Sequence, residues 1–240
     1  MTMGTRIVVM KDGFMQQVDT PINLYDYPIN QFVAGFLGTP QMNFFPAKLV
    51  GKKTQVFIEF GMEKIPLPKD KVKLIVNLEQ YLNTDKEIVF GIRPEDIHDE
   101  QDWLETEAPK ISVKVDFVEA LGPETILHCK TREEETDNKD KSDSIIDDIA
   151  NLTAKVDSRS TTKAGDQIEV AIDMKHCHMF DKGTEITILA RSEENKAEIE
   201  DLIVRREEEE ERKAKEEAAR QALEEAQALA AAEKARGKKR

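Results

Sequence analysis

The side chains best suited to chemistry in this 240-residue chain are its four histidines and two cysteines. Three of them are consecutive, His176-Cys177-His178, and in a strand residues 176 and 178 would point to one face, spaced as two imidazole ligands of a metal ion. A third and a fourth ligand are not evident, so a structural role is favoured over a metal site. His98 and His128 belong to no recognisable motif and are interpreted as surface or packing residues.

Carboxylate pairs and phosphate-binding loops are the other features that could support catalysis. Glu95 and Asp96 are adjacent and therefore face different ways, which argues against an acid–base pair. The Gly-x-x-x-x-Gly-Lys-Ser/Thr loop, whose backbone N–H groups wrap nucleotide phosphates, does not occur, and neither does a Gly-x-Ser-x-Gly nucleophile elbow. The sequence therefore predicts no catalytic residue, no cofactor-binding residue and no metal ligand, and it leaves enzymatic activity uncertain.

Charge and composition restrict the partners. Acidic residues number 48 against 35 basic ones, the formal net charge is −13, and aromatic residues make up 6%. Because nucleic-acid binding depends on clustered Lys and Arg beside exposed aromatics, nucleic acid is disfavoured as the main partner. The sequence has no run of about 18 apolar residues and no apolar signal core at its start. Two cysteines suit a reducing compartment, so we expect a cytoplasmic protein.

Hydrophobic patterning predicts many short strands and a few helices. Residues 6–10 and 14–18 read as a hairpin, followed by a helix with Thr20 as N-cap and Pro21 at its first position, and then by a second helix through residues 32–36. From about residue 42, turn residues separate a series of short apolar segments, which is typical of a β-sandwich or small barrel. The expected strands are 44–45, 47–50, 55–60, 71–76, 87–90, 111–118, 125–129, 167–172 and 185–189.

Two segments depart from this pattern. Residues 131–162 open with an acidic, polar stretch and are interpreted as a mobile inserted loop with a helical turn at 145–152. Residues 193–236 are rich in Glu, Ala, Lys and Arg with sparse apolar positions, which predicts a solvated, partly frayed helix. A weak coiled coil and disorder remain as alternatives for this tail.

The first 45 residues contain an ordered series of short matches to a known family, and their order and spacing together are specific. The matching residues are Met3 to Gly13, Gln17, Thr20-Pro21, Leu24-Tyr25, Pro28, Phe32-Val33-Ala34, Phe36, Gly38, Pro40 and Met42-Asn43-Phe44. This stretch resembles the last part of the nucleotide-binding domain in the maltose/multiple-sugar importer ATPase family. In that family it closely follows a histidine that contacts the ATP γ-phosphate, so the resemblance implies that Met1 is internal to a longer protein or at the edge of a fragment.

Three further clusters, at residues 91–97, 119–125 and 178–181, resemble the family's C-terminal regulatory region, which is built from OB-type β-barrels. The favoured interpretation of these clusters is structural. Arg93 beside Pro94 would pin a turn through a salt bridge with Glu95 or another acid. In the same way, Phe180 would pack inward while His178 and Asp181 cap the turn before Gly183. The alternative is that the clusters line a dimer contact or an effector groove, for which the candidates are Arg93, Pro94, Glu95, Gly122, Glu124, His178, Phe180 and Asp181.

The resemblance implies a mainly β fold class with flanking α-helices, divided into three parts. Residues 1–45 would be the end of an ABC nucleotide-binding domain. Residues 46–192 would form an OB-type (TOBE) regulatory domain with an acidic insertion near 131–162, and residues 193–240 a long charged helical tail.

The implied function is that of the C-terminal portion of the ATPase subunit that energises ABC-type import of sugars or related solutes. This chain would supply the regulatory and dimerising domain without the ATP site, because ATP and Mg²⁺ bind to other parts of the full-length family. The implied partners are a second copy of the chain and membrane permease subunits, at the inner face of the cell membrane. The alternatives are a stand-alone OB-type module that binds a small solute or oxyanion, and a nucleic-acid-binding OB protein.

Overall fold

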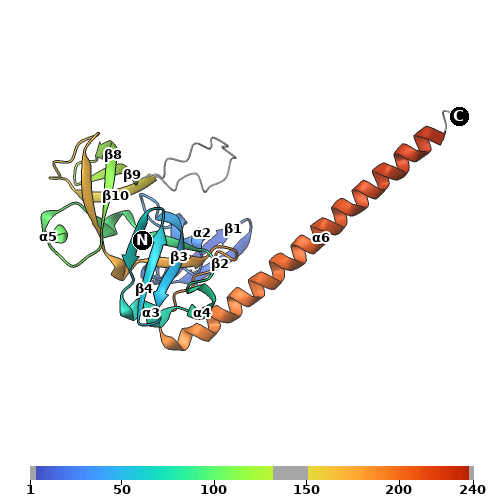
Figure 1. The fold of residues 1–240 in the computed structure, drawn as a ribbon, viewed down its shortest axis with the longest axis horizontal. Helices are drawn as coiled ribbons and strands as arrows, with labels where there is room; N and C mark the ends of the chain where they lie inside the picture. The colour runs from blue at the N-terminus through green and yellow to red at the C-terminus, as the bar shows by residue number, and fades with distance from the viewer. Residues whose placement is uncertain (1–3, 132–150, 238–240) are drawn as a thin grey trace. The chain divides into compact units, whose positions relative to one another are not determined.

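The computed structural model of the chain describes residues 4–131 and 151–237. It opens with the predicted hairpin, β1 (Ile7–Lys11) and β2 (Phe14–Asp19), followed by α1 (Pro21–Asp26) and α2 (Gln31–Phe36) (Figure 1). Helix α1 begins as expected, because the Thr20 side chain accepts a hydrogen bond from the backbone N–H of Asn23. Strand β1 packs on both helices through a small apolar core of Val9, Leu24 and Val33.

Two five-stranded antiparallel sheets follow, in the orders β12-β6-β3-β4-β5 and β10-β9-β8-β11-β7. The first comprises β3 (Asn43–Lys52), β4 (Gln55–Phe60), β5 (Glu63–Pro66), β6 (Ile88–Ile92) and β12 (His178–Asp181). The second comprises β7 (Ile97–His98), β8 (Lys110–Ala120), β9 (Glu124–Thr131), β10 (Asn151–Asp157) and β11 (Gln167–Ile172). Short helices connect strands within each sheet: α3 (Lys69–Leu74) and α4 (Leu78–Tyr81) lie between β5 and β6, and α5 (Gln101–Leu104) lies between β7 and β8. The prediction of a mainly β fold with flanking helices is therefore confirmed.

In both sheets several strands, among them β3, β4, β8 and β10, bury every second side chain, whereas β6 is buried along its whole length. In the first sheet the rings of Phe45, Phe60 and Phe90 pack together, with centroid separations of 5.1 to 6.2 Å. In the second sheet Ile111, Val113 and Val115 are buried at every second position of β8. Alternation predicted β8 from the sequence, and the other expected strands were predicted as short apolar segments between turn residues.

Three expectations about local structure need correction. Residues 71–76 are not a strand: residues 69–74 form α3, which begins after Pro68 and has an acid in its first turn and two lysines in its last, in accord with the helix dipole. Residues 185–189 make only isolated bridges to three different segments, because Glu185 adopts a left-handed φ of 61° that interrupts an extended ladder. Residues 151–157 belong to strand β10 rather than to a loop, and the rest of the helical turn expected at 145–152 lies outside the described residues.

Residues 201–240 form a second compact unit, separate from residues 1–200. Helix α6 (Lys196–Gly237) starts in the first unit and makes up the described part of the second. Ion pairs between residues four positions apart stabilise the exposed surface of α6. Examples are Arg205 with Asp201 at 2.7 Å and Lys215 with Glu211 at 3.4 Å. The long charged helix is therefore confirmed. Of the residues described, no helix combines the length and the apolar character needed to cross a bilayer.

Gly51, at the end of β3, offers a sharp test of the first sheet. Its φ is 119°, and a Cβ atom there would lie 2.4 Å from the carbonyl oxygen of Gln55. We expect Gly51→Ala to lower the free energy of unfolding by about 2–4 kcal/mol, because backbone strain and a steric clash add up. Gly61→Ala is the matched control: φ is 53° and nothing lies within 4 Å of the new methyl, so about 1 kcal/mol is expected. Equal urea midpoints for the two variants would contradict this account.

Candidate functional site at the sheet junction

Two connections cross side by side from one sheet to the other. The first runs from β6 to β7 through a 3₁₀ turn, η1 (Pro94–Asp96), and the second from β11 to β12 through η3 (Met174–His176). Strand β6 pairs with β12 and β7 with β11, and between them the N–H of Asp173 donates to the carbonyl of Asp96 at 2.9 Å. The cluster at 91–97 and the His176-Cys177-His178 segment, far apart in the sequence, therefore meet at this junction.

Arg93 fastens the junction to the N-terminal helices. Its side chain is 3% exposed, donates to the carbonyls of Tyr25 at 2.7 Å and Leu37 at 2.6 Å, and stacks 3.5 Å from the Tyr25 ring centroid. Burial lowers its pKa to about 10, against the opposing effect of the Asp96 and Asp26 carboxylates. The expected salt bridge to Glu95 is replaced by two backbone carbonyls. Gly38 makes room for the guanidinium, since a Cβ there would lie 3.0 Å from Nη1.

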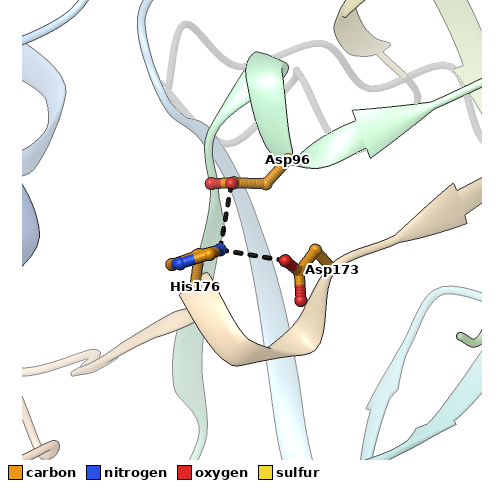
Figure 2. A group of neighbouring side chains, drawn as sticks. All are labelled: Asp96, Asp173 and His176. Carbon is orange, nitrogen blue, oxygen red and sulfur yellow. Dashed lines mark hydrogen bonds and ion pairs between the residues drawn. The ribbon is translucent and has the colours of Figure 1, made fainter.

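Figure 2 shows a second cluster, in which Asp96 of η1 and Asp173 at the start of η3 converge on His176. Nδ1 of His176 lies 3.0 Å from Asp173 Oδ2 and 3.4 Å from Asp96 Oδ1. The two carboxylates are largely buried, whereas 64% of the imidazole is exposed. Burial raises the pKa of Asp96 to about 7; the charge of His176 opposes this shift, whereas Glu95 and Asp173 add to it.

The other residues of the histidine segment point elsewhere. His178 is a strand residue that pairs with Gly91, so it does not cap the turn before Gly183 as expected. It lines a cavity of about 150 Å³ together with Lys71 and Arg191. Burial and the neighbouring charges of Arg93, Lys71 and His176 lower the pKa of His178 to about 3, so this imidazole is neutral at physiological pH. Cys177 is buried and remains a thiol, because burial raises its pKa to about 11.

Asp181 and Phe180 behave as the sequence predicted. Phe180 is fully buried, and Asp181, 1% exposed, caps the turn by accepting hydrogen bonds from the N–H groups of Gly183 and Thr184 through Oδ1. Its other oxygen, Oδ2, lies 3.0 Å from both Tyr81 Oη and Lys86 Nζ. Burial alone would raise the pKa of Asp181, but these donors more than offset it and hold the pKa below 3.8.

The remaining candidates separate into the junction and a distant hairpin. Pro94 and Glu95 belong to η1, where Pro94 is buried and Glu95 half-buried. Gly122, with φ of 95°, forms the β8–β9 turn, and Glu124 pairs with Lys155 of β10 at 2.5 Å. The three clusters therefore do not form one site: 91–97 and 178–181 meet, whereas 119–125 is the tip of a hairpin in the second sheet.

Two important residues escaped the sequence analysis. Asn43 bridges the sheets, because its amide donates to the carbonyl of Ile92 and exchanges two hydrogen bonds with the backbone of Thr153. Asn43 was part of a matching motif, but nothing in the sequence showed that it faces strand β10. Asp173 carried no signal beyond being an acid that can cap a turn, since its partner Asp96 lies 77 positions away in sequence (173 − 96).

Fold and junction together define a mainly antiparallel β protein with an OB-type fold. Residues 38–97 match the family of MalK OB fold domains. The chain is 40% identical over 189 residues to the oligosaccharides import ATP-binding protein MsmX of Bacillus subtilis, covering 78% of this chain and 46% of that protein. It is 35% identical over 189 residues to the trehalose/maltose import ATP-binding protein MalK of Thermococcus litoralis, covering 77% and 44%.

These matches confirm the predicted resemblance: the chain is homologous to ATP-binding subunits of ABC importers and contains a MalK-type OB fold. It spans about half the length of the curated relatives it matches. Among solved structures, a molybdate-bound form of the cytoplasmic molybdate-binding protein ModG matches at 11% identity with a TM-score of 0.39, covering 57% of this chain and 94% of that one. At that level neither fold nor ligand is inferred.

Replacing Arg93 tests whether the junction holds the N-terminal helices. We expect Arg93→Lys to lower the free energy of unfolding by about 2–4 kcal/mol, because an ammonium cannot reproduce the fork between two carbonyls or the stacking on Tyr25. Hydrogen exchange of the amides in residues 20–37 should accelerate before that of β8 or β9. The exposed Arg205→Lys, in a surface pair with Asp201, is the control and should change stability by less than about 0.5 kcal/mol. Unchanged exchange in residues 20–37 would argue against the clamp.

Asp181 allows a test with a pH signature. Asp181→Asn should destabilise the chain by about 2–4 kcal/mol at pH 7, because a neutral amide accepts less strongly from Lys86 and Thr184. Since the folded pKa is depressed, the stabilisation by the carboxylate is complete above its unfolded pKa of about 4 and disappears as the pH falls through the folded pKa. In urea unfolding at pH 7, 4 and 3, the difference in the free energy of unfolding between wild type and Asp181→Asn should therefore become smaller as the pH falls. A difference in unfolding free energy that does not depend on pH would refute the role given to the Asp181 carboxylate. The control is Asp85→Ala, which removes an exposed ion pair with Lys48.

Proposed function

We propose that the chain supplies the regulatory and dimerising part of an ATP-binding subunit that energises ABC-type import of a sugar or related solute. The observation that carries the proposal is the similarity to import ATP-binding proteins, which reaches 40% identity over 189 residues and covers 78% of this chain. Nucleotide and Mg²⁺ would bind in the remaining half of such a subunit. The membrane permease would hold the assembled subunit at the inner face of the membrane.

The Arg93 clamp supports this proposal because it gives the β-sheets a mechanical connection to the end of the ATP-binding domain. A guanidinium from the OB-type sheet binds the carbonyls at the ends of α1 and α2. Any displacement of these helices must therefore move β6, or break two charge-assisted hydrogen bonds. A regulatory domain needs such a rigid connection to sense or restrain the ATPase.

The exposed face of the β1–β2 hairpin provides independent support. Val9 is buried against the helices, whereas Val8, Met10 and Met15, the last two of which are cross-strand partners, are between 50% and 65% exposed. An apolar face of this size is unusual on an isolated module and indicates a covering partner. The proposal assigns this role to the ATP-binding portion of the subunit.

Dimerisation is assigned to the β8–β9 hairpin, which holds the candidates Gly122 and Glu124. Two large apolar side chains are exposed beside them, Phe117 at 56% and Leu121 at 53%. In a two-fold contact both copies of the chain would bury these two side chains. Burying one leucine contributes about 1.5–3 kcal/mol to the free energy of association. A small apolar centre of this kind, rimmed by charged strands, is the usual composition of a protein–protein contact.

We expect the purified chain to dimerise, and Leu121→Asp to weaken the dimer at least about tenfold, as measured by sedimentation equilibrium. The matched control is Met62→Asp, which alters a comparably exposed apolar residue in the β4–β5 turn of the other sheet and should leave the dimer unchanged. A chain that stays monomeric at high concentration would exclude the dimerising role. A dimer weakened equally by both variants would move the contact away from the β8–β9 hairpin.

A further inference from the structure

The cluster of Asp96, Asp173 and His176 offers one imidazole nitrogen and two carboxylate oxygens within 4.8 Å of one another. They come from two separate connections that the sheet pairing holds side by side (Figure 2). Neither the proposed transport role nor the Arg93 clamp uses these side chains. The question is therefore why the fold brings two acids and a histidine together at this point.

Ordinary hydrogen bonding does not explain the cluster fully. The two acids share the same nitrogen, Nδ1 of His176, at 3.0 Å and 3.4 Å. Nδ1 carries at most one hydrogen, and the shorter distance gives it to Asp173. Asp96, with 15% of its side chain exposed, is left with no better donor among the described side chains. The nearest strong cation, the Arg93 guanidinium, donates to the carbonyls of Tyr25 and Leu37 instead.

The spacing is compatible with a small metal ion as well as with the hydrogen bond between His176 and Asp173. Zinc bonds of about 2.0–2.2 Å to nitrogen and oxygen place neighbouring ligand atoms of a tetrahedral site about 3.3–3.5 Å apart. The two measured separations, 3.0 and 3.4 Å, lie close to this value. Small side-chain rotations would thus let all three atoms face one ion. With Nδ1 as ligand, the imidazole proton would sit on Nε2, on the exposed part of the ring.

Neighbouring backbone bonds orient the ligands. Asp173 Oδ1 accepts from the N–H of Lys175 at 3.0 Å, which leaves Oδ2 to face His176. The hydrogen bond from the backbone N–H of Asp173 to the carbonyl of Asp96 keeps the two acids next to each other. Such second contacts to ligating groups are typical of metal sites. The exposed side of His176 leaves room for water to complete the coordination.

We propose that Asp96, Asp173 and His176 bind a divalent transition-metal ion, with Zn²⁺ as the ion that this nitrogen and oxygen donor set suits best. Imidazole disfavours Mg²⁺ and Ca²⁺, which prefer oxygen ligands alone. The ion would join the β6–β7 connection to the β11–β12 connection and so stiffen the junction between the two sheets. The site is independent of the proposed transport function, because it requires neither nucleotide nor dimer.

The test is calorimetric titration of ZnCl₂ into the full chain, free of any polyhistidine tag, at pH 7.5. We expect one Zn²⁺ per chain, and at least a tenfold weaker Kd in His176→Gln and in Asp96→Asn. His176 is mostly exposed, so its variant should fold even where Asp96→Asn does not. The control is His128→Gln, which removes an exposed histidine paired with the single acid Glu119 and should leave the affinity unchanged.

Absorption spectra of the Co²⁺-substituted protein identify the ligands. Nitrogen and oxygen ligation, with the spectrum retained in Cys177→Ser, is the expected result. Cysteine ligation, a Zn²⁺ affinity insensitive to His176→Gln, or loss of affinity in His128→Gln would overturn the proposal. Absence of Zn²⁺ binding at millimolar concentration would also overturn the proposal. A higher unfolding temperature of Asp96→Asn would then indicate that the two acids share a proton instead of a metal ion.

Discussion

The buried guanidinium of Arg93 is the interaction on which the arrangement of this chain depends. An arginine that is 3% exposed must recover its lost hydration from protein groups, and here two backbone carbonyls and one aromatic ring supply most of it. The carbonyls belong to residues near the ends of α1 and α2, where helices leave acceptors unsatisfied. The carbonyl acceptors at the helix ends and the N–H donors of Arg93 thus satisfy each other's hydrogen bonds. The β-sheet is held against the N-terminal helices by these polar contacts as well as by apolar packing.

A series of buried polar side chains continues from this point through the molecule. Asn43 ties β3 to β6 and β10, and Asp181 ties the turn after β12 to α4 and to Lys86. Each of these side chains bonds to groups distant in sequence, and a buried polar group is costly when its partner is missing. Substitutions among the apolar core residues should therefore be tolerated more easily than changes in the relative positions of the two sheets and the turn after β12. That property suits a domain whose proposed task is to transmit or restrain motion.

The sequence predicted the elements better than their meeting points. Alternation revealed β8, short apolar segments between turn residues revealed β4 and β9, and the Thr20-Pro21 start of α1 followed from capping chemistry alone. The same alternation misled at 71–76, where a short amphipathic helix with charged ends has apolar residues at the spacing of a strand. Motif matching singled out Arg93 but assigned it a local salt bridge, because its true partners are backbone carbonyls, which a sequence does not display. His176 was recognised as a possible ligand, yet its neighbours in space are acids from elsewhere rather than His178.

The junction joins these features in one place, and its electrostatics explain why a cation suits it. The guanidinium of Arg93 donates its hydrogen bonds to carbonyls, so the acids Asp96, Glu95 and Asp173 feel its positive charge only at a distance, and the closest cationic group to Asp96 and Asp173 is His176. Protonation of the acids would leave the two connections joined by strand pairing and one backbone hydrogen bond, whereas a metal ion would add bonds to side chains of both. Because Arg93 is the N-cap residue of η1 and Asp96 is its last residue, any stiffening of the η1 turn also fixes the position of the guanidinium against α1 and α2. Occupancy of the cluster would then alter how firmly the sheets are coupled to the N-terminal helices, even though the ion contacts none of those helices.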